Sequence, residues 1–169
     1  MIRRGRPDEV EQLRAVERVA GRRFADVGLA DVAAHEPMAA EELAEYAADG
    51  RCWVALDDDG AVTGYVIVEV VDGCAHVEQL SVLPEQQGRG HGRRLLNEVE
   101  TWAGEQGLPA LTLTTFADVP WNRPLYEHLG FRVLAEAELT PPLVAVRHAE
   151  AEMGLDPGTR VVMRRDLSR

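Results

Sequence analysis

The stretch that decides the fold is Gln86-Gln87-Gly88-Arg89-Gly90-His91-Gly92, which lies between an apolar run ending at Pro84 and a helical pattern beginning near Arg93. Three glycines at every second position allow the backbone to approach a ligand closely, because no Cβ atoms stand in the way. A helix that follows directly offers unpaired N–H groups and the positive end of its dipole, which suits a phosphate. The stretch therefore predicts a loop that binds pyrophosphate.

Two common phosphate-binding loops are excluded by the residues themselves. A Walker loop needs Lys followed by Ser or Thr after its last glycine, and this chain contains no lysine. A dinucleotide-binding fingerprint needs Gly-x-Gly-x-x-Gly, whereas the spacing here is Gly-x-Gly-x-Gly. The loop must therefore belong to a different class.

Hydrophobic periodicity on either side of the loop predicts an alternation of helices and strands. Before the loop we expect helices near 8–24 and 40–48, the first opened by a capping box of Asp8 and Glu11, and an antiparallel meander of strands at 52–56, 62–71 and 75–83. After it we expect a helix from Arg93, a strand at 111–115, a short helix framed by Pro124 and Gly130, a strand from 131, a helix between Thr140 and Gly154, and a last strand at 160–164. The expected fold is a single α/β (α+β mixed) domain over 1–169, with a mixed, mostly antiparallel central sheet flanked by helices on both faces.

Composition limits the partners and the compartment. Hydrophobic residues make up 46% of the chain, yet no run approaches the roughly 18 apolar residues of a membrane span. The N-terminus has no apolar stretch typical of a signal peptide, so we expect a cytoplasmic protein without a membrane partner. The formal net charge of −11 argues against nucleic acid and favours a cationic partner, unless the acidity serves solubility alone.

The cysteines and histidines suggest neither a disulfide nor a metal site. Cys52 and Cys74 are the only two cysteines, and they fall on predicted strands that a third strand separates. We expect both to be reduced and buried. No cluster of Cys and His has the spacing of a zinc site, so no metal is expected.

Two motifs together resemble those of the GNAT N-acetyltransferases. The pattern Gln87-x-x-Gly90-x-Gly92, preceded by Val82-x-Pro84 and followed by Leu95-Leu96, resembles the acyl-CoA loop of that family. Downstream, the stretch from Leu125 to Phe131 resembles its closing Leu-Tyr-x-x-x-Gly-Phe signature. The resemblance covers about 51–134, and it implies the GNAT fold with acetyl-CoA as co-substrate.

The resemblance also implies which residues hold acetyl-CoA. Main-chain groups of Leu80, Ser81 and Val82 are expected at the pantetheine arm and the thioester oxygen. Asn122 is a candidate for a further contact with the arm, although family members often carry an Asn where this chain has Val119. The pyrophosphate is expected to lie against Gln87, Gly88, Arg89, Gly90, His91, Gly92 and Arg93.

Candidate catalytic residues follow from the same comparison. Tyr126 is the expected general acid, since a phenol and a thiolate have similar basicity. Glu78 is the first candidate for the general base and His76 the second, because residues two apart on a strand share one face. Water, Asp118 and His128 remain alternatives. Some family members place the base on the next strand, where this chain has Thr114, whose hydroxyl cannot serve as a base.

The predicted activity is acetyl-CoA-dependent transfer of an acetyl group to a primary amine. Direct transfer in a ternary complex is expected, because no Cys or Ser is placed as a nucleophile. A small cationic acceptor is favoured, including the amines of antibiotics. The alternatives are acetylation of a protein N-terminus or lysine, and a non-catalytic regulator that binds acyl-CoA. A homodimer is also predicted, because the apolar strand at 161–163 resembles an exposed edge.

Overall fold

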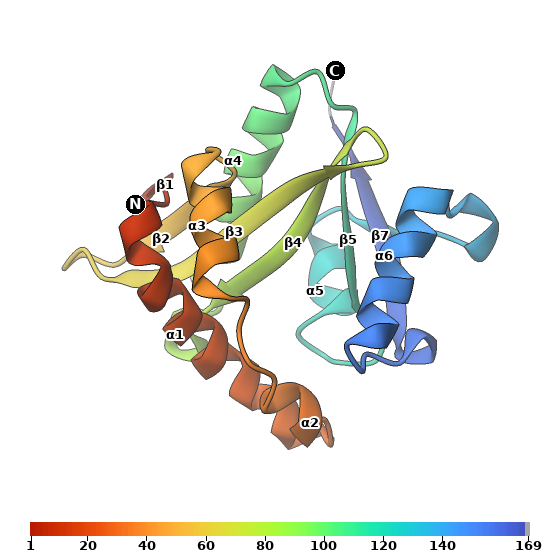
Figure 1. Ribbon diagram of the computed structural model, residues 1–169, viewed down its shortest axis with the longest axis horizontal. Coiled ribbons are helices and arrows are strands. Elements are labelled where there is room, and N and C mark those ends of the chain that lie inside the picture. Colours follow the sequence, from red (N-terminus) through yellow and green to blue (C-terminus); the bar gives the residue numbers. More distant parts are fainter. Residues whose placement is uncertain (168–169) are drawn as a thin grey trace. The chain divides into compact units, whose positions relative to one another are not determined.

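The computed structural model describes residues 1–167, in which seven strands follow the order β1-β2-β3-β4-β5-β7-β6 (Figure 1). The pairing of β4 with β5 is parallel, whereas β1–β2, β2–β3, β5–β7 and β6–β7 are antiparallel. The expected mixed, mostly antiparallel sheet is therefore confirmed. Contacts divide the chain into two compact units. The first comprises 1–68 and 78–99, and the second comprises 69–77 and the chain from residue 100 onward.

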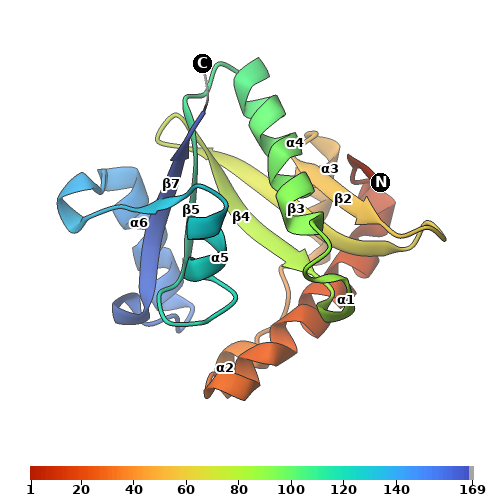
Figure 2. The ribbon, with the colours of Figure 1, turned by 180° about the vertical axis from the view of Figure 1, so that it is seen from behind.

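The first unit contains the meander and the glycine loop. Helices α1 and α3 cover one face of β2 and β3 (Figure 1), and α4 covers the opposite face (Figure 2). Buried side chains such as Leu13 on α1, Leu43 on α3 and Tyr65 on β3 form one apolar cluster. The elements are β1 Ile2–Arg4, α1 Val10–Gly21, α2 Ala30–Ala33, α3 Ala40–Ala48, β2 Cys52–Leu56, β3 Val62–Val71, β4 Cys74–Val82 and α4 His91–Glu105, and the last three of these extend into the second unit.

The start of the first helix differs from the prediction. Helix α1 begins at Val10, after a 3₁₀ turn over Pro7–Glu9, and no capping box of Asp8 and Glu11 forms. The carboxylate of Glu9 instead accepts a hydrogen bond from the Arg6 N–H at 2.8 Å and pairs with the Arg3 guanidinium at 2.7 Å. The partner Arg3 lies on β1, a three-residue strand that has too little apolar alternation to be predicted.

The second unit is built around β5 and β7. Strand β7 pairs with β5 along its whole length, and residues Ala75–Val77 of β4 run parallel to Leu111–Leu113 of β5. Helix α6 lies on one side of β5 and β7, with α5 on the other side (Figures 1 and 2). The remaining elements are β5 Ala110–Phe116, α5 Arg123–His128, β6 Arg132–Val133, α6 Pro141–Glu152 and β7 Arg160–Asp166.

The last strand is not the edge that the sequence suggested. Strand β7 pairs with β5 on one side, and on the other side Met163 and Arg164 pair with β6. Leu134 extends this contact by donating its N–H to the Val162 carbonyl at 2.8 Å. The argument for a homodimer through an exposed strand at 161–163 is therefore wrong, and the homodimer itself stays a prediction.

Both cysteines are buried free thiols, as predicted. Cys52 lies on β2 in the first unit, and Cys74 begins β4 in the second. Burial raises the pKa of the Cys52 thiol to about 12, and it also raises the pKa of Cys74. Both side chains are therefore uncharged at neutral pH.

We predict that Gly64→Ala destabilises the first unit where β3 approaches β4. A Cβ at Gly64 would lie 2.9 Å from the Ser81 carbonyl oxygen and 3.2 Å from the Val82 side chain, and the main chain cannot move aside freely. Overpacking of this kind costs about 1–3 kcal/mol. Thermal melting checks the prediction.

Gly104→Ala in α4 is the matched control, because a Cβ there meets nothing within 4 Å among residues 1–167. It is expected to stabilise the helix by up to about 1 kcal/mol, since alanine is the better helix former. Equal melting temperatures for the two variants would contradict a tight contact between β3 and β4.

Candidate functional site

The loop at 87–92 combines two left-handed glycines with the start of a helix. Gly88 and Gly90 have φ angles of 80° and 81°, a region that residues with a Cβ adopt rarely. Gly92 lies in the first turn of α4. Within the described part of the chain, a Cβ at any of the three would meet nothing within 4 Å, so open space borders the loop.

The first turn of α4 presents unpaired donors and positive charge. The Arg94 N–H bonds to the Gly90 carbonyl at 3.0 Å, and the preceding N–H groups of a helix that begins at His91 have no acceptor within the helix. The side chains of Arg89 and Arg93 are exposed, and within residues 1–167 neither has a hydrogen-bond or ion-pair partner. In a chain of net charge −11, this turn is a suitable place for an anion.

Two of the predicted loop residues hold the loop in place through side-chain hydrogen bonds. Gln87 donates from Nε2 to the Val82 carbonyl at 3.2 Å and accepts from the Arg23 guanidinium. His91 is buried, with Nδ1 3.4 Å from the Thr63 hydroxyl, and burial together with nearby positive charge lowers its pKa. Both contacts tie the loop to the strands before it.

The end of β4 carries the residues predicted at the thioester. Ser81 is buried, and its hydroxyl accepts from the Gln79 side chain at 2.8 Å, whereas Leu80 and Val82 are half-buried. Glu78, the first candidate for the general base, is half-buried on the same strand. Close approach of β3 at Gly64 holds this end of β4 in place.

Tyr126 and Asn122 belong to the second unit, on the short helix α5. The Asn122 carbonyl accepts from the Tyr126 N–H at 3.0 Å, and the Asn122 side chain makes no hydrogen bond within residues 1–167. The Tyr126 ring packs edge-on against Phe131, with centroids 5.7 Å apart. Burial raises the pKa of the phenol to about 12, although the positive charge of Arg160 opposes the shift. Tyr126 therefore keeps its proton at neutral pH.

His76, the second candidate base, is held inside the second unit. It is only 2% exposed, and Nδ1 lies 2.8 Å from the Thr112 hydroxyl on β5. Burial lowers its pKa to about 4. A histidine so deeply enclosed is poorly placed to accept a proton from an incoming amine.

A polar cluster that the sequence did not predict joins β5, α6 and β7 in the second unit. Thr114 on β5 donates its hydroxyl to Glu150 Oε2 at 2.5 Å, and Arg160 Nη2 donates to the same carboxylate oxygen at 2.9 Å. Arg160 Nη2 also bonds the Thr114 hydroxyl oxygen at 3.0 Å. The cluster brings a carboxylate from the C-terminal helix onto a central strand.

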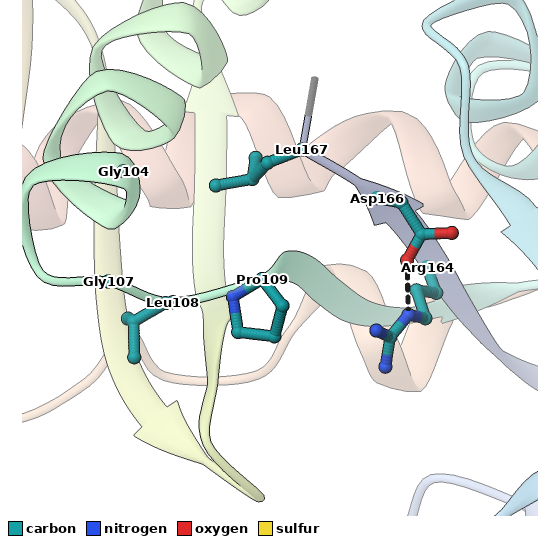
Figure 3. Close-up of a pocket in the computed structure, with 7 residues that line it drawn as sticks. All are labelled: Gly104, Gly107, Leu108, Pro109, Arg164, Asp166 and Leu167. Carbon is teal, nitrogen blue, oxygen red and sulfur yellow. Dashed lines mark hydrogen bonds and ion pairs between the residues drawn. The ribbon is translucent and has the colours of Figure 1, made fainter. Parts of the chain in front are cut away.

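A hollow of about 490 Å³ lies elsewhere, where the C-terminal end of α4 meets the start of β5 and the end of β7 (Figure 3). Leu108, Pro109 and Leu167 line it, with the Arg164–Asp166 ion pair beside them. It contains none of the predicted site residues.

Within residues 1–167, no helix is long and apolar enough to cross a membrane, and no group of three or more His, Cys, Asp or Glu is arranged to hold a metal ion.

Comparison with known proteins identifies the family. Residues 15–131 match the acetyltransferase (GNAT) family, and they include both the glycine loop and the Tyr126 motif. The chain belongs to the GNAT family. Membership confirms the family that the two motifs indicated, one of acetyltransferases, and the GNAT fold.

Individual relatives agree with this assignment. A mycothiol acetyltransferase of Geodermatophilus obscurus is 33% identical over 115 residues, which cover 68% of this GNAT chain and 34% of the relative. The chain thus spans about a third of the length of that protein.

PaiA N-acetyltransferase from Thermoplasma acidophilum, in complex with coenzyme A, matches 98% of each chain with a TM-score of 0.72 at 16% identity. N-acetylglutamate synthase from Neisseria gonorrhoeae, with coenzyme A and N-acetyl-glutamate, covers all of this chain and 35% of its own, with a TM-score of 0.73 at 20% identity. At these identities the two structures show the shared fold alone.

Sequence reasoning missed Glu150 and Arg160 because they lie outside the two GNAT motifs. Glu150 is one of several acidic residues on the predicted helix 141–153, and nothing in their spacing distinguishes it. One residue did hint at this cluster. Thr114 is a polar residue in an otherwise mostly buried strand, and such a side chain needs a hydrogen-bond partner.

Proposed function

We propose that this chain is an acetyl-CoA-dependent N-acetyltransferase that acts on a primary amine by direct transfer in a ternary complex. The observation that carries the proposal is the loop at 87–92, with its left-handed glycines, the N–H groups at the start of α4 that have no acceptor within the helix, and two arginines that have no partner within residues 1–167. These features suit the pyrophosphate of a coenzyme A thioester. The structures of PaiA and N-acetylglutamate synthase, both solved with coenzyme A, lend further support.

Direct transfer is supported by the state of the two thiols. A covalent acetyl-enzyme through cysteine needs an accessible thiolate. Cys52 and Cys74 are both buried, and the pKa of each is raised. We therefore assign the chemistry to attack by the amine on the thioester, followed by loss of the thiolate, which Tyr126 protonates.

The acceptor is proposed to be a small molecule with a primary amine. The relative named for mycothiol supports a small acceptor, and the net charge of −11 favours a cationic one. A homodimer and a cytoplasmic location accompany this proposal as expectations from the sequence.

A screen of amines for release of free coenzyme A tests the proposal. The panel includes polyamines, amino sugars, free amino acids and short peptides with a free N-terminus or a lysine, each with acetyl-CoA at saturation. Release that depends on a small amine is the expected result. Release with peptides alone would replace the small acceptor with a protein, and no release with any amine would favour a regulator that only binds acyl-CoA.

A further inference from the structure

Arg23 lies outside the two GNAT motifs, yet its side chain contacts the glycine loop. It belongs to a 3₁₀ helix, Arg22–Val27, that continues directly from the end of α1. Its Nη1 group donates to Oε1 of Gln87, a residue 64 positions further along the chain, and both residues belong to the first compact unit. Both views of the ribbon show the turn before α4 beside α1 (Figures 1 and 2). A cation from the N-terminal part of the chain is thereby placed against the loop that is expected to bind pyrophosphate.

Gln87 connects Arg23 to two parts of the expected cofactor site. Its Oε1 atom accepts from the Arg23 guanidinium, while its Nε2 group donates to the Val82 carbonyl at 3.2 Å. Val82 ends β4, where the pantetheine arm is expected, and Gln87 itself begins the loop that leads to the first turn of α4. The Arg23 guanidinium therefore lies near the place where the arm of acetyl-CoA is expected to join its pyrophosphate.

Positive charge from two distant segments gathers at the loop. The side chains of Arg89 and Arg93 are exposed there. Burial lowers the pKa of His91, and the positive charges of Arg94 and Arg89 lower it further, so these charges act on the loop as well. Arg23 adds one more charge from the segment after α1. In a chain with 29 acidic and 18 basic side chains apart from histidine, four arginines at one short loop favour a ligand with several negative charges.

A phosphate is a stronger partner for Arg23 than the amide of Gln87. A guanidinium presents several N–H donors in one plane, a geometry that matches the oxygens of a phosphate. Hydrogen bonds in which the groups are ionised are roughly twice as strong as those between neutral groups. The amide oxygen of Gln87 is neutral, so it orients Arg23 at the loop without cancelling its charge.

We propose that Arg23 binds the pyrophosphate of acetyl-CoA directly, as a cofactor-binding residue that the segment after α1 supplies to the glycine loop. This inference rests on the acetyl-CoA binding of the proposed function. The loop and the first turn of α4 offer main-chain N–H groups to the pyrophosphate, and Arg23 adds a guanidinium that Gln87 holds in position.

Isothermal titration of Arg23→Gln with acetyl-CoA tests the proposal. Loss of a charge-assisted hydrogen bond to phosphate should weaken binding by roughly 10- to 100-fold. Arg23→Lys keeps the charge and should recover part of the affinity. Rising salt should weaken binding by the wild type more steeply than binding by Arg23→Gln, because screening acts on the contact that the variant lacks. Melting curves without ligand confirm that each variant folds.

Arg22→Gln is the matched control. Arg22 is the preceding residue of the same 3₁₀ helix, it is exposed, and its side chain has no hydrogen-bond or ion-pair partner within residues 1–167. Successive side chains of a 3₁₀ helix point about 120° apart, so Arg22 projects in a different direction from Arg23. The control changes the net charge equally and should bind acetyl-CoA with nearly the wild-type affinity.

Two further comparisons locate the contact. Acetyl-dephospho-CoA keeps the pyrophosphate and lacks the 3′-phosphate, so Arg23→Gln should weaken its binding by the same factor as that of acetyl-CoA. In a Gln87→Ala background, Arg23→Gln should still weaken binding, because the arginine acts on the phosphate and not only through Gln87. A loss confined to acetyl-CoA would assign Arg23 to the 3′-phosphate, and no loss in the Gln87→Ala background would reduce Arg23 to a support for that side chain. Either result overturns the proposal.

Failure of this inference is distinct from failure of the proposed function. A wild-type protein that does not bind acetyl-CoA would overturn both. If the wild type binds acetyl-CoA and Arg23→Gln binds it equally tightly, the role of Arg23 alone is overturned. Because the titration needs no acceptor amine, its result does not depend on the outcome of the amine screen.

Discussion

Gly90→Asp is expected to abolish the rise in melting temperature that acetyl-CoA gives to the wild-type protein. A ligand that binds only the folded state stabilises it by about 2.7 kcal/mol at one hundred times its Kd. For a chain of this size that corresponds to a shift of roughly 5–11 °C. Aspartate at this left-handed position would place a carboxylate in the open space that borders the loop, where it would repel a pyrophosphate.

Gly60→Asp separates this effect from backbone strain. Gly60 has a φ of 83° in the turn between β2 and β3, and a Cβ there also meets no described residue within 4 Å. The two variants therefore carry the same substitution in the same backbone region, and Gly60→Asp should retain the full acetyl-CoA shift. An unchanged melting curve of the wild type in millimolar acetyl-CoA would reject the cofactor.

Tyr126→Phe should lower kcat by roughly 10²-fold or more while the affinity for acetyl-CoA changes little. The substitution removes one hydroxyl and keeps the ring that packs against Phe131. Because burial raises the pKa of Tyr126 to about 12, the phenol stays protonated across the whole physiological range, which is the state that a general acid requires. Single-turnover and steady-state rates at pH 7 to 9 provide the measurement.

Tyr46→Phe provides the comparison for this variant. Tyr46 lies on α3 in the first unit, where its ring packs against the Arg51 guanidinium at 4.6 Å. Loss of its hydroxyl should leave kcat unchanged. A fully active Tyr126→Phe would mean that solvent protonates the thiolate and that Tyr126 only packs.

Most of the fold was predictable because its elements carry strong local signals. The meander follows from apolar runs interrupted by Asp-Gly turns, and the helix before Gly154 follows from Thr140 and the prolines after it. The short strand β1 was not predictable, since its place is decided by pairing with β2, fifty residues away. The position of β7 inside the sheet, likewise, depends on β6, which is only two residues long.

The candidate site also contains parts with a local sequence signal and parts that depend on distant residues. The glycine loop and Tyr126 lie in motifs that are encoded over a few adjacent residues, so the sequence alone is enough to propose them. The environment of His76 and the partners of Thr114 depend on side chains that lie about 36 residues away, Thr112 and Glu150. Contacts of that kind leave no local pattern, and only a folded chain reveals them.

The burial of both cysteines has a practical consequence for measuring turnover. Thiol-specific colour reagents react with thiolates that they can reach, and free coenzyme A carries such a group. Cys52 and Cys74 are buried, and the pKa of each is raised, so the folded enzyme should contribute almost no background. Product can then be followed continuously with unmodified protein, and a single cysteine introduced on the surface would accept a fluorescent label without first removing the native pair.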